Sequence, residues 1–188
     1  MRKASTIIMA ILLVVAVGCK KEKKEAEKEA ETVVENVEVK KIKAALTSKS
    51  DSKVTGSVVF TEENGKVKMV AVLEGLTPGE HAIHLHEKAD CSAPDATSSG
   101  GHWNPTFADH GKWGEAKGYH KGDIGNFTAN ESGLATVNFS TDEWCIGCGD
   151  PNKDITGKAV VVHQGVDDFV SQPSGAAGAR VSCAGIIE

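Results

Sequence analysis

The sequence has no hydrophobic run long enough to cross a lipid bilayer as a helix. Its longest unbroken apolar stretch is Ile7–Val17, which is well short of the roughly 20 residues that a spanning helix needs. The stretch follows Arg2 and Lys3, and a short apolar core behind basic residues is typical of a signal peptide. We therefore predict a signal peptide over residues 1–18.

An excess of positive charge is also missing. The chain has 21 Lys and Arg against 26 Asp and Glu, and residues 44–188 alone carry 11 against 19, a formal charge of −8. Nucleic-acid binding depends on cations that neutralise backbone phosphates. We therefore expect no nucleic acid among the partners.

Aromatic residues are absent from Lys20–Lys43, which contains 8 Lys and 7 Glu. Such a segment cannot bury a core, so we expect a solvated tether. The preceding Ala16-Val17-Gly18-Cys19 resembles the cleavage box of bacterial lipoproteins. That resemblance implies lipidation of Cys19, a tether over 19–43 and an extracytoplasmic protein anchored in a membrane. The alternative is an ordinary signal peptide followed by an incidental cysteine.

Residues 44–188 show no internal repeat and no long helical pattern, and they are numerous enough for one hydrophobic core. Apolar residues alternate instead over short segments bounded by turns such as Asn64-Gly65 and Pro78-Gly79. We predict an all-β domain of about eight strands, a Greek-key β-sandwich or barrel of the immunoglobulin-like kind. The expected strands are Ala44–Ser48, Val54–Thr61, Val67–Leu73, His81–His86, Ile124–Ala129, Leu134–Phe139, Ala159–His163 and Val181–Ile187.

Two long glycine-rich segments interrupt the strand pattern, Glu87–Gly122 and Gln164–Ala179. Loops of this length in a compact domain are usually functional. The first contains three histidines, and the second directly follows His163.

The expected strand His81–His86 places His84 and His86 on one face, because side chains on a strand alternate. Imidazoles two residues apart form a pair of ligands for copper or zinc. His81 should point to the other face, as a hydrogen-bonded packing residue.

The candidate metal ligands are too many for one tetrahedral zinc, which takes four. Two adjacent ions sharing one imidazole would use all of them. They are His84, His86, His102, His110, His120, Asp123 and His163.

Five stretches resemble the copper-zinc superoxide dismutases in order and spacing. They are His81–Glu87, Gly100–Pro105, His120–Asn126, Val161–His163 with Asp167-Asp168, and Gly178–Cys183. The resemblance spans about Val54–Glu188, and it implies copper and zinc as cofactors and superoxide as the substrate.

The resemblance also implies a role for each matching residue. The copper ligands would be His84, His86, His102 and His163, and the zinc ligands His102, His110, His120 and Asp123. His102 would bridge the two metals. Asp167 would hydrogen-bond one ligand histidine of each metal, Arg180 would receive the anionic substrate, and Cys91 would form a disulfide with Cys183.

The implied reaction converts superoxide to oxygen and hydrogen peroxide by alternate reduction and oxidation of copper, with His102 delivering a proton. One alternative is an extracytoplasmic copper carrier on the same fold without turnover, and another is a structural sandwich stabilised by zinc. The loop Gln164–Ala179 contains no lysine, so steering of the anion would rely on other cations such as Lys88. A monomer and a homodimer both remain open.

Cys145 and Cys148 lie outside the family pattern. A small disulfide loop, a soft metal site and a redox-active pair all suit this spacing. Gly149-Asp150-Pro151 follows as a turn, which removes the helix that usually supports a reactive thiolate. We therefore predict a second disulfide between Cys145 and Cys148.

Overall fold

The computed structural model describes residues 39–187, and all of these belong to one compact unit. Within that part of the chain, no helix is long and apolar enough to cross a membrane. The predicted signal peptide and Cys19 lie outside the described residues, as does the tether up to residue 38.

Eight β-strands and one short 3-10 helix, η1 (Thr97–Ser99), make up the regular structure of the described residues. The strands are β1 (Lys40–Ser48), β2 (Thr55–Glu63), β3 (Lys66–Glu74), β4 (Gly79–His86), β5 (Gly125–Ala129), β6 (Ala135–Thr141), β7 (Ala159–His163) and β8 (Arg180–Gly185). Each corresponds to one strand that the sequence predicts.

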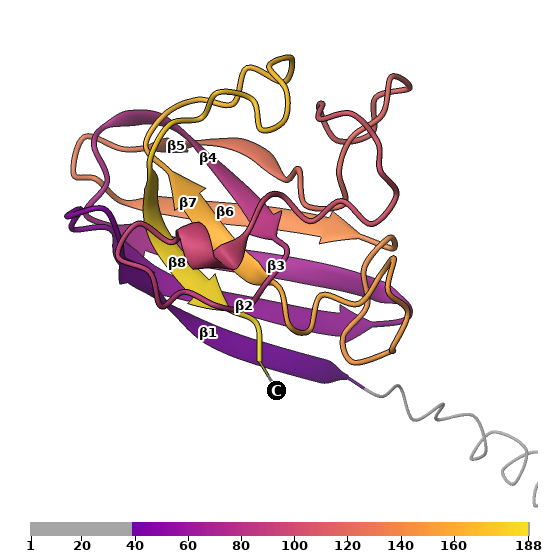
Figure 1. Ribbon diagram of the computed structural model, residues 1–188. Coiled ribbons are helices and arrows are strands. Elements are labelled where there is room, and N and C mark those ends of the chain that lie inside the picture. Colours follow the sequence, from indigo (N-terminus) through magenta and orange to yellow (C-terminus); the bar gives the residue numbers. More distant parts are fainter. Residues whose placement is uncertain (1–38, 188) are drawn as a thin grey trace, which may run out of the picture. The chain divides into compact units, whose positions relative to one another are not determined.

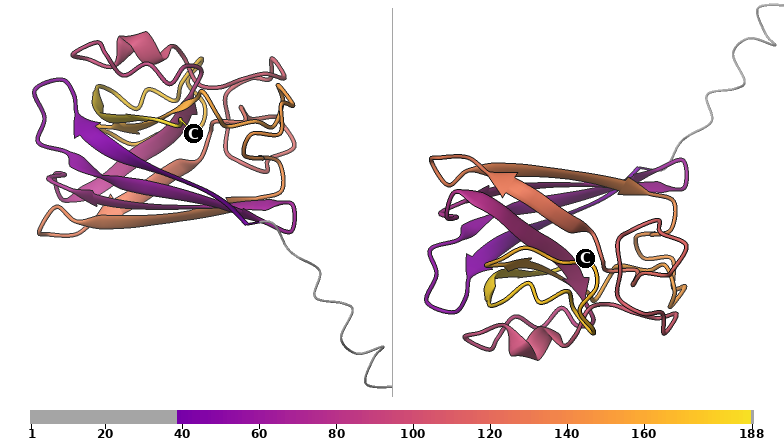
Figure 2. Two further views of the ribbon diagram at one scale, coloured as in Figure 1. Left: turned by 90° about the horizontal axis from the view of Figure 1, so that it is seen from below. Right: turned by 90° about the horizontal axis from the view of Figure 1, so that it is seen from above.

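The strands form two layers in the order β5-β4-β7-β8-β1-β2-β3-β6, with every neighbouring pair antiparallel. One layer holds β1, β2, β3 and β6, and the other holds β5, β4, β7 and β8 (Figures 1 and 2). Only Thr47↔Cys183 and Ser48↔Ser182 join them through the β1–β8 pairing. Consecutive strands such as β3 and β4 lie in different layers, so the predicted eight-stranded Greek-key sandwich is confirmed.

The core lies between the layers and follows the strand alternation. In β3, Val67, Met69, Ala71 and Leu73 are buried while the residues between them are mostly exposed. Strand β4 differs, because it is buried from His81 to His86 on both faces. Ile83 belongs to the core cluster, and the histidines on the opposite face lie beneath the long loops.

Strand β1 begins at Lys40, earlier than the expected start at Ala44. Lys40 is in register with Glu62, and its Nζ donates a hydrogen bond to the carbonyl of Ile146 at 2.9 Å. Ile42 is only 6% exposed and fills the core, while Lys41 and Lys43 point to solvent. The sequence did not reveal this part of the strand, because Ile42 is the only apolar residue among the four from Lys40 to Lys43.

The predicted disulfide between Cys91 and Cys183 is present and ties the first long loop to β8. Cys145 and Cys148 are also disulfide-bonded, in the β6–β7 connection. This small loop is held by the carboxylate of Asp154, which accepts hydrogen bonds from the backbone N–H groups of Gly147 and Gly149. Both the disulfide and the carboxylate of Asp154 therefore hold the conformation of this loop.

Candidate metal centre

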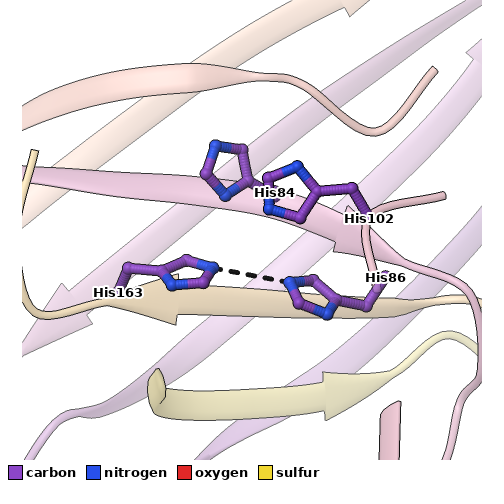
Figure 3. Close-up of side chains that lie close together, drawn as sticks. All are labelled: His84, His86, His102 and His163. Atoms are coloured by element: carbon purple, nitrogen blue, oxygen red, sulfur yellow. Dashed lines mark hydrogen bonds between the residues drawn. The ribbon is translucent and has the colours of Figure 1, made fainter. Parts of the chain in front are cut away.

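Four histidines from two strands and one loop form the first cluster. His84 and His86 come from β4, His163 from the end of β7, and His102 from the first long loop (Figure 3). One ring nitrogen of each lies within 4.8 Å of the others. The Nε2 atoms of His86 and His163 are 3.4 Å apart. The cluster offers four imidazole ligands, and all four residues are buried.

His102 also belongs to the second cluster, together with His110, His120 and Asp123. Oδ1 of Asp123 is 2.8 Å from Nδ1 of His102 and 3.2 Å from Nδ1 of His120. Its other oxygen is 2.9 Å from Nδ1 of His110. Because Asp123 belongs only to this cluster, Nδ1 is the atom that His102 presents here, and Nε2 remains for the first cluster.

His81 belongs to neither cluster, as its place on the strand predicts. Its Nδ1 and the carbonyl oxygen of His163 are 3.1 Å apart, and its Nε2 lies 2.8 Å from the carbonyl oxygen of Thr77. The hydroxyl of Thr77 also lies 3.2 Å from Nε2, so both ring nitrogens have hydrogen-bond partners in the fold and the side chain packs β4 against its neighbours.

Several buried ring nitrogens lack a hydrogen-bond partner among the described residues. They are Nδ1 of His84, Nε2 of His102, Nδ1 of His110 and Nδ1 of His120. The nitrogens of His110 and His120 lie close to the oxygens of Asp123 but are not aligned for hydrogen bonds. A buried polar atom without a partner is costly. Each of these nitrogens belongs to a residue of one or both clusters, so a metal ion at each cluster would give them a partner.

Asp167 links the two clusters, because its carboxylate contacts one histidine of each. Its oxygens accept hydrogen bonds from Nε2 of His84 and Nε2 of His110, both at 2.9 Å. Such partners orient ligand imidazoles, so that their other nitrogens face the metal. Gly175 permits this arrangement, because a Cβ there would lie 1.8 Å from Oδ1 of Asp167 and its φ is +67°.

Two further side chains hold this arrangement in place, and the sequence analysis missed both. The side-chain amide of Asn126 exchanges two hydrogen bonds of 2.8 Å with the backbone of Asp167. Gln172 does the same with the backbone of His110, at 2.9 Å each. Their only sequence signal is a position beside or within a long loop, which does not reveal such contacts.

Electrostatics favour the neutral form of the three histidines His86, His102 and His163, and metal binding requires neutral imidazoles. Burial lowers the pKa of His86 and of His163 well below the ordinary value, and neighbouring imidazoles add to this. Burial also lowers the pKa of His102 to about 4, against the opposing hydrogen bond to Asp123.

The pKa of His110 shifts in the opposite direction. Burial would lower its pKa, but the carboxylate of Asp123 close to Nδ1 and the hydrogen bond to Asp167 outweigh burial and raise it to about 9. The same contacts act on the two carboxyl groups. Although burial opposes their ionisation, hydrogen bonds from the histidines hold the pKa of Asp123 and of Asp167 well below the ordinary value.

A cavity of about 400 Å³ opens onto the first cluster. It is lined by His86, His102, His163 and Arg180 together with small residues of the second long loop. Arg180 is the only Lys or Arg among the described lining residues, and Glu87 is the only acidic one. The structure therefore places Arg180 in the wall of this cavity, while Lys88 does not line it.

Comparisons with known proteins agree with this geometry. Residues 54–186 match the family model described as copper/zinc superoxide dismutase (SODC). A protein named superoxide dismutase [Cu-Zn] from Caulobacter vibrioides is 38% identical over 148 residues, which cover 77% of this chain and 84% of that one.

Solved structures with the same fold include two proteins of different description. A double mutant of a SOD-like protein from Bacillus subtilis matches with a TM-score of 0.69 and 29% identity, over 78% of this chain and 97% of that one. The clock protein EA4 matches with a TM-score of 0.67 and 33% identity, over 78% and 94%.

Proposed function

Since this chain belongs to the copper/zinc superoxide dismutase family, we propose that it converts superoxide to oxygen and hydrogen peroxide at the two clusters around His102. The observation that carries the proposal is the position of His102 in both clusters, with one ring nitrogen available to each. A lone structural zinc site would need only one cluster.

The donor sets differ in a way that suits two metals. The all-imidazole cluster of His84, His86, His102 and His163 matches the preference of copper, while three imidazoles and Asp123 complete a tetrahedral zinc site. When bound, copper supplies reversible one-electron chemistry, and zinc supplies a fixed charge that orders the first long loop.

The chain itself would handle the anion and the proton. Arg180 attracts superoxide into the cavity and holds it beside the first cluster. Nε2 of His102 has no hydrogen-bond partner among the described residues, and its ring belongs to both clusters. This nitrogen is therefore suited to take up a proton and release it. Asp123, 2.8 Å from Nδ1, keeps the ring oriented meanwhile.

A copper carrier on the same fold is the competing function. A carrier needs neither a complete second cluster nor an arginine in the cavity, and this chain has both. The two functions differ in how much superoxide each chain consumes, because a carrier has no catalytic cycle. Superoxide decay should therefore be followed directly after loading the full chain with copper and zinc. The assay contains a chelator that inactivates free copper. Catalytic decay under this condition supports the dismutase, and its absence in the copper- and zinc-loaded chain removes it.

We further propose that the protein is exported and anchored to a membrane through a lipidated Cys19. The support is the sequence of residues 1–43 and the disulfide between Cys91 and Cys183, since disulfides persist in oxidising compartments. The full chain expressed in a bacterium should incorporate a labelled fatty acid and fractionate with membranes. Cys19→Ser should abolish the label, and a label retained by that variant would overturn the assignment.

A further inference from the structure

Ser99 ends η1 and is completely buried, in contact with Arg180 and His86, which line the cavity. The metal and substrate assignments above leave it without a role. Its hydroxyl lies between Arg180 and His86, 3.2 Å from Nη1 of Arg180 and 3.4 Å from Nδ1 of His86. A buried hydroxyl is costly unless its hydrogen-bonding capacity is used.

The hydrogen-bonding pattern of this hydroxyl can be assigned fully. A serine hydroxyl donates one hydrogen bond and accepts up to two. Ser99 donates to the carbonyl of Ala96 at 2.8 Å. Arg180 and the Nδ1–H of His86 are then left to donate to the serine oxygen. Nη1 of Arg180 also donates a hydrogen bond to the carbonyl of Ala96 at 2.8 Å. The Ser99 hydroxyl and this carbonyl therefore both accept hydrogen bonds from the same nitrogen.

The contact with Arg180 matters more than the contact with His86. Nδ1 of His86 already has a shorter bond to the carbonyl of Gly100, at 2.9 Å. Arg180 has no other side-chain hydrogen-bond partner among the described residues. Without the hydroxyl, its guanidinium would keep a single acceptor and could rotate about it.

We propose that Ser99 is a positioning residue that fixes the guanidinium of Arg180 toward the cavity and thereby sets how strongly the cavity binds a small anion. This role rests on the proposed function, because it concerns the reception of the anionic substrate. Alanine at this position would keep both backbone hydrogen bonds of Ser99. Its N–H donates to the carbonyl of Ala96, and its carbonyl accepts from the N–H of Lys88.

Ser98 provides a matched control. It lies in the same short helix, and its hydroxyl donates to the carbonyl of Asp90 and accepts from the N–H of Ala93. These bonds hold the same loop but do not touch the cavity. A purely structural effect on the loop should therefore be shared by Ser98→Ala and Ser99→Ala.

The test is a titration with azide, a small monovalent anion, of the full chain loaded with copper and zinc. Binding is followed by the visible absorption of copper, so the readout is affinity and not turnover. We expect Ser99→Ala to weaken azide binding by about threefold to tenfold, the range for the loss of one ordinary hydrogen bond, because Arg180 keeps its other bond to the carbonyl of Ala96. Ser98→Ala should bind azide like the wild type. Equal azide affinity in Ser99→Ala and the wild type would overturn the proposal.

A double-mutant cycle identifies the route of the effect. If Ser99 acts through Arg180, then Ser99→Ala should change azide affinity no further in an Arg180→Ala background. A full effect that persists there would place the action at His86 and contradict the proposal. Superoxide decay by the wild type is measured separately. A wild type that binds azide as expected but lacks turnover would refute the dismutase and leave the role of Ser99 standing.

Discussion

His84 and His110, which belong to different clusters, donate their Nε2 hydrogens to opposite oxygens of one carboxylate, that of Asp167. Each ring thereby presents its Nδ1 to its own cluster, and both of these atoms are buried without an aligned partner among the described residues. The two clusters are therefore joined twice, directly by the ring of His102 and indirectly through Asp167.

Removing this carboxylate should weaken the second cluster. In Asp167→Ala, His110 loses the group that fixes its ring, and we expect zinc affinity to fall by about 10-fold to 100-fold, as for other partners of ligand histidines. The measurement is a zinc titration of the metal-free chain against a competing chelator.

Asp168→Ala is the control for this variant. Asp168 is the next residue, but it is exposed and accepts hydrogen bonds only within its own loop, from Val170 and Ser171. Its removal should leave zinc affinity unchanged. Equal affinities in the two variants would show that Asp167 does not orient His110.

Zinc binding should strengthen with rising pH. The pKa of His110 in the metal-free chain is raised to about 9, so the ring is mainly protonated below that pH, and zinc must displace the proton. Affinity should therefore rise between about pH 6 and pH 9, by up to about tenfold per pH unit for one displaced proton, and level off above it. Chelator competition at several pH values checks this, and a constant affinity across the range would contradict it.

Arg180→Ala should lower the second-order rate with superoxide while both metals stay bound. The residue lines the cavity and is not a member of either cluster. Loss of one charge close to the anion should cost about tenfold or more. Arg180→Glu should be slower still, and only the wild-type rate should fall as salt screens the attraction. Rates by direct superoxide decay, with metal content by elemental analysis, test this. An unchanged rate in Arg180→Glu would remove the residue from the mechanism.

The disulfide of Cys145 and Cys148 should be dispensable for turnover. It closes a small loop whose backbone N–H groups are also held by Asp154. We expect the double variant Cys145→Ser, Cys148→Ser to keep about wild-type activity once it is loaded with both metals in vitro. A large loss of activity in the fully loaded variant would show that the thiols themselves take part.

The sequence predicted the strand order along the chain and the membership of both clusters. Alternation in His81–His86 separated His81 from His84 and His86, because a strand has only two faces. The remaining ligands depended on motif resemblance, since nothing local to His102 shows that one ring would reach two clusters.

Contacts between distant segments could not be predicted in the same way. Ser99, Asn126 and Gln172 act through hydrogen bonds to residues between 13 and 81 positions away. Such partners are set by how the loops fold over β4 and β7. The start of β1 was missed for a related reason, because Ile42 is recognisable as a core residue only once β2 lies beside it.

The full chain, loaded with copper and zinc, should turn over superoxide catalytically at the clusters around His102. The most direct measurement counts the superoxide consumed and the oxygen and hydrogen peroxide formed per chain, beside a sample loaded with zinc alone. We expect consumption far beyond the copper content, equal amounts of the two products, and no catalysis with zinc alone. Consumption that stops near one superoxide per copper, or peroxide formed without oxygen, would show that the chain is not a dismutase.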